Sequence, residues 1–251
     1  MPSVTASPGS YWSLSRSPRY SIALALPLLV LYEALAAMLG VAGSGVRNGA
    51  DVILKSPFVA VAGQWGPMIF VVLLMIIGGW YAIRDLRRAR GAGRTALSPR
   101  ILVLMLVESA VLAVAFGIVV GIATAHLLSS LGILAMAQVE RLGAIERLMV
   151  SLGAGLYEEL LFRVLLVGGL LWLGRRVFGW RNRVAGTVAV VVGALVFSAF
   201  HYVGPYGDPF EIRSFAYRAV GGLAFSGLYV VRGFGITAWT HALYDVFLLV
   251  L

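Results

Sequence analysis

Apolar residues fall into seven long runs separated by shorter polar segments. A helix needs about 20 such residues to cross the hydrocarbon core of a bilayer, and each run approaches or exceeds that length. The pattern predicts an all-α fold, a polytopic transmembrane helix bundle of about seven spans, with six to eight as the range. The runs are roughly 20–42, 64–83, 101–125, 148–173, 184–201, 216–231 and 235–251.

Two segments stand apart from these runs. Residues 1–18 are polar and contain serine and proline, so they are predicted to form a loose tail. The stretch 126–147 has a short apolar half followed by four charged residues, and could be an eighth span or an interfacial helix. We divide the chain into this tail, N-terminal transmembrane helices at 19–147 and a C-terminal helical core at 148–251 that holds the chemistry-bearing residues, all within one integral membrane domain.

Composition supports a membrane protein and excludes several other classes. The 251 residues are 60% hydrophobic and 12% charged, whereas soluble domains carry about 25% charged residues. Cysteine is absent, which excludes disulfides, thiolate nucleophiles and cysteine metal sites. The net charge of +9 comes from arginine, since Lys55 is the single lysine. No basic stripe on a soluble fold accompanies it, so the expected partner is the lipid bilayer and no nucleic acid is expected.

Arginine placement predicts the orientation, because cytoplasmic loops carry an excess of positive charge. Arginines crowd the segments 84–100 and 174–183, and Arg16 and Arg19 precede the first span. Seven spans place all three groups, and the N-terminus, in the cytoplasm; an eighth would not, which favours the interfacial interpretation of 126–147. The loops near 43–62 and 202–215 and the C-terminus then face outward. The arginine-rich, compact chain suggests a bacterial inner membrane.

Three charged residues interrupt the fourth apolar run. A charge at the centre of a spanning helix costs about 2.5–3.5 kcal/mol on insertion scales, so Glu158, Glu159 and Arg163 call for an explanation. Residues four apart share a helix face, which pairs Glu159 with Arg163. Glu158 is rotated away by about 100° and has no partner in the helix. Glu159 and Arg163 are therefore predicted to be structural and Glu158 to be free for acid–base chemistry, although all three could belong to a purely structural salt-bridge cluster.

Two further apolar runs contain histidine. His201 follows Phe197 by one turn at the end of one run, and His241 precedes Asp245 by one turn in the last run. Asp245 can accept a hydrogen bond from one ring nitrogen of His241 and leave the other for a substrate. Either motif alone is commonly structural. Together the three runs supply a carboxylate, two imidazoles and an orienting carboxylate, which is a set suited to hydrolysis.

Other polar residues in the apolar runs receive no firm role. His126, at the end of the third run, is assigned none. Glu33 and Glu108 are also acids inside predicted spans, and either could pair with Arg213 or Arg218 or line a polar cavity.

The three motifs resemble the signature of a known family. Glu-Glu-x-x-x-Arg at 158–163, Phe-x-x-x-His at 197–201 and His-x-x-x-Asn/Asp at 241–245 are similar, in order and separation, to motifs of the CAAX-protease and bacteriocin-processing family. Its members are also called Abi proteins or type II CAAX prenyl endopeptidases. The stretch 217–229 resembles the family's weaker glycine-rich motif.

The resemblance implies an intramembrane endopeptidase of the glutamate type that needs no cofactor. By the family's roles, Glu158 activates water with the help of His201, and His241 with the residue at 245 stabilises the oxyanion. Glu159 and Arg163 hold the geometry. Position 245 is Asp here, where prenyl-processing members have Asn, and an ionised carboxylate cannot donate a hydrogen bond. We therefore hypothesise that Asp245 orients and charges His241, which then donates.

Other chemistries fit the sequence less well. Glu158, His201, His241 and Asp245 are acceptable zinc ligands, but the chain has no His-Glu-x-x-His motif, so zinc is the less favoured alternative. Serine catalysis at Ser198 lacks a Gly-x-Ser-x-Gly elbow. An aspartyl protease needs two facing aspartates, and Asp245 is the only one in a predicted span. A proton-coupled transporter or a catalytically inactive membrane scaffold or immunity protein stays open as a non-enzymatic alternative, although no inverted repeat is found.

The predicted topology bears on the substrate. Glu158 lies about 24 Å from the cytoplasmic end of its helix, at 1.5 Å per residue. That depth places the site in the outer half of the membrane and suits C-terminal trimming or sorting of membrane or exported proteins. The expected substrate is a peptide or protein, with a membrane-anchored or lipidated C-terminus as one form of it.

Overall fold

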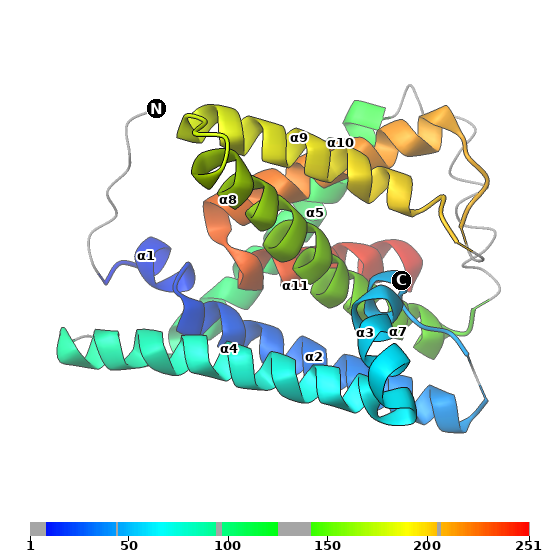
Figure 1. Ribbon diagram of the computed structural model, residues 1–251, viewed down its shortest axis with the longest axis horizontal. Helices are drawn as coiled ribbons and strands as arrows, with labels where there is room; N and C mark the ends of the chain where they lie inside the picture. Colours follow the sequence, from blue (N-terminus) through cyan, green and yellow to red (C-terminus); the bar gives the residue numbers. More distant parts are fainter. Residues whose placement is uncertain (1–8, 44, 94–96, 125–141, 205–206, 251) are drawn as a thin grey trace.

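The computed structural model describes residues 9–43, 45–93, 97–124, 142–204 and 207–250, and within these ranges every regular element is helical. The predicted all-α bundle is thus confirmed (Figure 1). The elements are α1 (Tyr11–Ser15), α2 (Pro18–Val41), α3 (Gly49–Ala62), η1 (Gly63–Trp65), α4 (Gly66–Gly91), α5 (Pro99–Thr124), α7 (Ala144–Gly153), η2 (Ala154–Val167), α8 (Gly168–Arg176), α9 (Asn182–Phe200), α10 (Ile212–Arg232) and α11 (Phe234–Leu249).

Four helical stretches are long and apolar enough to cross a membrane, which identifies an integral membrane protein. They are Pro18–Val41, Gly49–Gly91, Pro99–Ile122 and Asn182–Phe200. The count of seven spans stays a prediction. Most of the ambiguous stretch 126–147, including His126, lies outside the described residues, and its last part is the start of α7.

The elements α7, η2 and α8 form one helix through the middle of the bundle, drawn in green in Figure 1. Residues 151–159 are all buried, because α2, α3, α9 and α11 pack around this helix. Gly155 permits the closest approach: a Cβ there would lie 2.3 Å from the carbonyl oxygen of Ala238 in α11. Gly153 does the same for α2, since its Cβ would lie 2.5 Å from the Tyr32 ring.

The central part of this helix, η2, is π-helical. A π-helix has a wider turn than an α-helix, so it rotates consecutive residues by less than about 100°. Glu158 and Glu159 can therefore both point into the bundle, at 8% and 0% exposure. π-Helical turns are rare and are found often at functional sites.

Two expectations about the N-terminal part are wrong. The predicted outer loop near 43–62 contains the helix α3, whose first turn is capped by the Asn48 side chain. With η1 and α4 it forms the apolar helical stretch Gly49–Gly91, so Asp51 also lies inside a candidate span.

The predicted loose tail is wrong for its described part, because Tyr11–Ser15 forms the short helix α1. The Trp12 ring lies 3.8 Å from the Arg232 guanidinium, and Tyr11 donates a hydrogen bond to Glu108. These aromatic contacts hold α1 against α5 and the end of α10.

Candidate active site

Glu159 joins two of the three sequence motifs. Its Oε2 lies 3.1 Å from Nε of Arg163, so the predicted pair is present. Its Oε1 lies 2.7 Å from Nδ1 of His241. An ionised carboxylate only accepts hydrogen bonds, so Nδ1 of His241 carries the proton of this bond. Glu159 therefore links η2 to α11 and sets the orientation of the His241 ring.

The orienting role expected of Asp245 thus falls to Glu159. Asp245 Oδ2 lies 3.7 Å from Nε2 of His241, within ion-pair range but too far for a hydrogen bond. The i,i+4 spacing brings Asp245 near the ring, as expected, but the fully buried Glu159 on the neighbouring helix makes the closer contact. Asp245 is left facing the outer nitrogen of His241, the one expected to meet a substrate.

Glu158 is held by an amide and not by a cation. Its Oε1 accepts a 2.9 Å hydrogen bond from Nδ2 of Asn48, at the start of α3. Among the described residues, no lysine or arginine forms an ion pair with it. The charge of Glu158 interacts with His201, His241 and Arg163, which lie nearby. The predicted difference between Glu158 and Glu159 is therefore present in the structure.

His201 ends α9 beside this cluster. Its Nδ1 lies 2.9 Å from the carbonyl oxygen of Phe197, which can only accept, so Nδ1 is the donor. In the neutral ring, Nε2 is then a hydrogen-bond acceptor. The Phe-x-x-x-His motif thereby acquires a physical meaning, because residue 197 supplies the carbonyl that selects the tautomer of residue 201.

Two phenylalanine rings enclose the polar groups. Phe225 stacks on His241 with 4.2 Å between ring centroids, and Phe197 meets His201 edge-on at 5.0 Å. The fully buried Arg163 guanidinium lies 4.5 Å from the Phe197 ring centroid and 5.6 Å from that of Phe225. Such cation–π contacts stabilise a charge away from water.

Sequence reasoning missed two residues of this arrangement, Phe225 and Asn48. Phe225 lies in the glycine-rich stretch 217–229, where Gly222 lets α10 approach α9: its Cβ would lie 3.1 Å from Cα of Ala194. The resemblance of that stretch to a family motif could have indicated that Phe225 lies at the site. Asn48 gave only the signal of a helix cap, Asn followed by Gly and Ala, and nothing local connects it with Glu158.

Glu33 and Glu108 do not pair with Arg213 or Arg218, as was considered. Glu33 Oε1 lies 2.7 Å from Nζ of Lys55, and Glu108 lies 2.6 Å from Nε of Arg232. Both arginines considered for them lie in the first turns of α10, where Arg218 pairs with Asp208.

Asp51, which lies in the candidate span Gly49–Gly91, is also engaged. Oδ1 pairs with Lys55 at 2.6 Å and Oδ2 accepts a hydrogen bond from Tyr32 at 2.8 Å. Both of its oxygens have partners, so the structure offers no support for an aspartyl pair with Asp245.

In the part of the chain that is described, no group of three or more histidines, aspartates and glutamates is arranged to hold a metal ion. The two glutamates of the site are bound by protein groups: Glu159 lies at hydrogen-bonding distance from His241, and Glu158 accepts from the Asn48 amide. The expectation that no cofactor is required stays a prediction.

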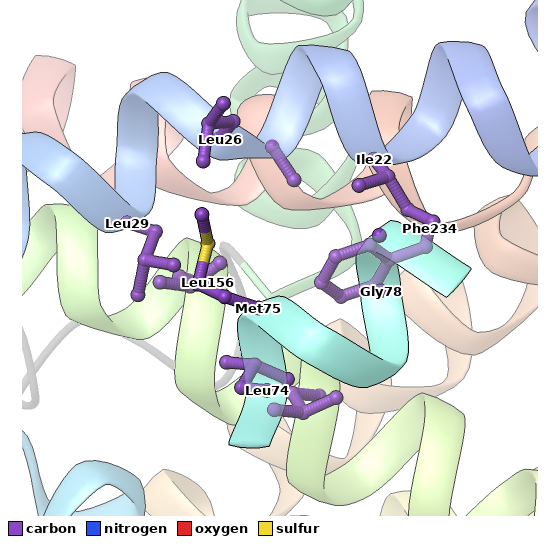
Figure 2. Close-up of a pocket in the computed structure, with 11 residues that line it drawn as sticks. Ile22, Leu26, Leu29, Leu74, Met75, Gly78, Leu156 and Phe234 are labelled. Carbon is purple, nitrogen blue, oxygen red and sulfur yellow. The ribbon is translucent and has the colours of Figure 1, made fainter. Parts of the chain in front are cut away.

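An apolar cavity of about 210 Å³ lies on another side of the central helix. Figure 2 shows Leu26 and Leu29 of α2, Met75 of α4 and Leu156 of η2 around it, and no lining residue is charged. Leu156 and Leu160 bring this cavity onto the helix that carries Glu158. It is suited to a hydrocarbon chain and offers no group for hydrolysis.

Comparison with known proteins agrees with this arrangement. Residues 141–247 match the family model described as type II CAAX prenyl endopeptidase Rce1-like. The match contains all three motifs and the helices η2 to α11 that position them. The searches of curated proteins and of solved structures returned no match. The resemblance expected from the motifs is thus confirmed: residues 141–247 of this membrane protein match the model of the Rce1-like CAAX proteases.

Proposed function

We propose that the protein is an intramembrane endopeptidase in which Glu158 activates water. The match of residues 141–247 to a protease family supports hydrolysis of a peptide bond. The observation that carries the assignment of the base is the environment of Glu158: buried, bound by one neutral amide, near two imidazoles, and without a cation of its own among the described residues. A carboxylate in this state keeps lone pairs for a proton.

The proposed reaction follows from these groups. A water molecule gives a proton to Glu158 while its oxygen attacks the scissile carbonyl carbon. His201 accepts a hydrogen bond from that water through Nε2, since Nδ1 is occupied by Phe197. Glu158 then passes the proton to the leaving amine as the C–N bond breaks. Such acid–base assistance is typically worth about 10²–10⁴ in rate.

His241 is proposed to stabilise the oxyanion. Its Nδ1–H donates to Glu159, so only Nε2 is left to donate to the substrate. A histidine ring carries hydrogen on both nitrogens only as an imidazolium, so His241 is protonated in this role. Two carboxylates, Glu159 and Asp245, lie at the two nitrogens of this ring. Asp245 thus acts through His241 and supplies charge, and Glu159 supplies both charge and orientation. Arg163 offsets the charge of Glu159.

The substrate is proposed to be a membrane-anchored or exported protein cleaved near its C-terminus. Tyr32, which lies beside Asn48, is about 21 Å from the start of α2 at 1.5 Å per residue. With the N-terminus in the cytoplasm of a bacterial inner membrane, the site lies in the outer half of the bilayer. The apolar cavity beside Leu156 could take a lipid chain attached to such a substrate.

Terminus mapping tests this proposal. Membrane proteomes of cells that carry the wild-type protein or Glu158→Gln are compared for C-termini present in one and absent in the other. A protein that keeps its C-terminal segment in the variant identifies the substrate. Identical termini in both, with the variant present at the normal level, would leave the scaffold or transporter alternative. Cleavage by the purified protein in the presence of chelator tests metal dependence, and activity is expected to persist.

A further inference from the structure

Asn48 makes two kinds of hydrogen bond with one side chain. Its Oδ1 accepts from the backbone N–H groups of Ala50 at 2.9 Å and Asp51 at 3.4 Å, which caps α3. Its Nδ2 donates to Oε1 of Glu158 at 2.9 Å. The residue is 3% exposed and lies outside the segment that matches the protease family. The N-terminal part of the chain therefore reaches the proposed catalytic carboxylate directly.

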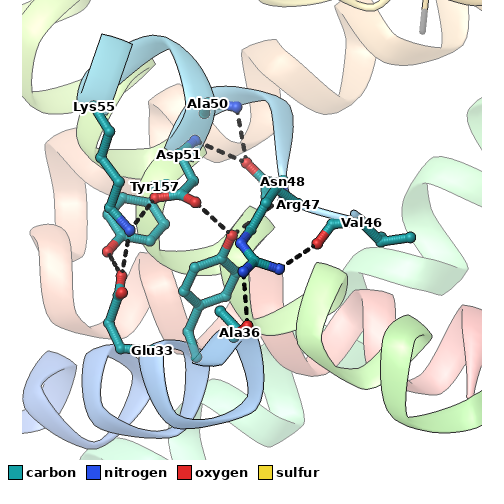
Figure 3. A network of polar contacts seen from close by, with 10 residues as sticks. Glu33, Ala36, Val46, Arg47, Asn48, Ala50, Asp51, Lys55 and Tyr157 are labelled. Carbon is teal, nitrogen blue, oxygen red and sulfur yellow. Dashed lines mark hydrogen bonds and ion pairs between the residues drawn. The ribbon is translucent and has the colours of Figure 1, made fainter. Parts of the chain in front are cut away.

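A network of polar contacts connects Asn48 with residues of α2, α3 and η2 (Figure 3). Lys55, one turn further along α3 from Asp51, bridges Asp51 at 2.6 Å and Glu33 of α2 at 2.7 Å. Asp51 accepts from the Tyr32 hydroxyl, and that hydroxyl accepts from the backbone N–H of Asn48 at 3.2 Å. Through these bonds the single lysine of the chain ties the first turns of α3 to α2.

The network is bound to the catalytic helix as well. Tyr157, the residue before Glu158, donates to Glu33, and the Lys55 ammonium lies 5.2 Å from the Tyr157 ring centroid. The same contacts that fix α3 thus also fix the η2 backbone next to Glu158. The network thus fixes both the helix that follows Asn48 and the helix that carries Glu158, and so keeps the two side chains at hydrogen-bonding distance.

We propose that Asn48 is a positioning residue for the endopeptidase reaction, which directs Glu158 by its amide donor, and that the Lys55 network sets its place. The proposal rests on the proposed function of Glu158. Because Nδ2 occupies Oε1, it is Oε2 that takes the proton from water. An amide orients the carboxylate without cancelling its charge, whereas an arginine at this place would form an ion pair and compete with water for both oxygens.

The two roles of Asn48 can be separated by substitution. Serine and aspartate cap helices about as well as asparagine, so Asn48→Ser and Asn48→Asp retain the α3 cap. Neither offers an amide donor, and the serine side chain is too short to reach Glu158 in its place. A residue that only caps α3 would tolerate the change to serine, whereas the change to aspartate also places a like charge beside Glu158.

The assay uses a synthetic peptide that spans the cleavage site found by terminus mapping. Asn48→Ser is expected to lower kcat by about tenfold to a hundredfold with KM within threefold of wild type. Asn48→Asp places an acceptor against Glu158 and is expected to lower kcat further. Thermal unfolding in detergent checks that the Asn48→Ser protein is folded. An unchanged kcat, or a loss confined to KM, would overturn the proposal.

A double-mutant cycle tests the network. Lys55→Met removes both ion pairs and is expected to lower kcat about threefold to tenfold, and Lys55→Arg to retain most of the activity. If Lys55 acts through Asn48, Lys55→Met causes no additional loss of kcat in the Asn48→Ser background. Additive losses would contradict this part of the proposal.

An infrared measurement tests the positioning role of Asn48 independently of the proposed catalytic role of Glu158. The carboxylate stretching band of Glu158 is assigned from the wild-type minus Glu158→Gln difference spectrum, without any substrate. Asn48→Ser is expected to shift this band, since a hydrogen bond to Oε1 is lost. An unmoved band contradicts the positioning role, whereas full cleavage by Glu158→Gln contradicts the proposed function itself.

Discussion

Glu108 and Glu158 are both acids within long apolar helices, and their surroundings differ. Glu108 receives two hydrogen bonds of 2.6 Å from the Arg232 guanidinium and another from Tyr11, and Arg232 also donates to Ser15 at 3.0 Å. Among the described residues, Glu158 receives one hydrogen bond, from the Asn48 amide. The first acid is neutralised by a bidentate partner, and the second keeps its charge and its lone pairs.

The difference follows from what each acid holds together. The Glu108–Arg232 pair joins α5 to the end of α10 and to α1, so its contacts fasten elements distant in sequence. Glu158 lies in the π-helical segment at the middle of the bundle, where the nearby cation Arg163 is bound to Glu159. A buried charge without an ion-pair partner destabilises the fold, and such charges occur often at functional sites.

Exchanging each acid for its amide gives the largest contrast. Glu158→Gln is expected to lower cleavage by at least about 10²–10⁴ and to leave stability nearly unchanged, because Gln can still accept from Asn48. Glu108→Gln is expected to retain kcat but lose up to about 3 kcal/mol of stability, since Arg232 is left without its partner. Cleavage assays and thermal unfolding in detergent measure both. Equal losses of activity would remove the distinction between the two acids.

The cation next to Glu158 is expected to matter for folding. Arg163→Met leaves Glu159 buried beside His241 without its arginine, and a loss of about 3–5 kcal/mol is expected. The double variant Arg163→Met/Glu159→Gln removes both charges and should recover part of that stability. Chemical or thermal unfolding of the three proteins decides the point. A stable single variant would mean either that His241 alone compensates the charge of Glu159 or that Glu159 is neutral in the fold.

The packing that holds Glu158 in the centre can be loosened by one methyl group. Gly155→Ala brings a Cβ within 2.3 Å of the Ala238 carbonyl oxygen and is expected to cost about 1–3 kcal/mol. Gly169→Ala, further along the same helix, is the matched control, because a Cβ there meets no atom within 4 Å among the described residues. The melting temperature of Gly155→Ala should therefore be lower than that of Gly169→Ala. Equal values would show that α11 can move away from the central helix.

The smallest effect is expected at Asp245. Glu159 already holds Nδ1 of His241, so Asp245→Asn should change kcat by less than about tenfold. Glu159→Gln should cost more, since it removes the charge in direct contact with the ring. Cleavage rates of the two variants at one pH give the comparison. A loss at Asp245→Asn that exceeds the loss at Glu159→Gln would restore Asp245 as the orienting group.

Several features were predictable because they depend on neighbours along the chain. The apolar runs gave the positions of the long helices, and the i,i+4 spacing gave the Glu159–Arg163 pair and the nearness of Asp245 to His241. The helix α3 was not recognised, because Lys55, Ser56 and Pro57 interrupt its apolar pattern. Lys55 pairs with Glu33 of α2, a partner that no local pattern identifies.

The sequence by itself determined a membrane-embedded helical bundle, the family of its C-terminal part, and the separation of Glu158 from the Glu159–Arg163 pair. Only the tertiary structure decided that Glu159 orients His241, that Asn48 reaches Glu158, and that Arg232 neutralises Glu108. The physical reason is the separation along the chain of the residues that interact. Helical periodicity relates residues within a turn or two, whereas hydrogen bonds between helices depend on crossing positions that close packing at residues such as Gly155 sets.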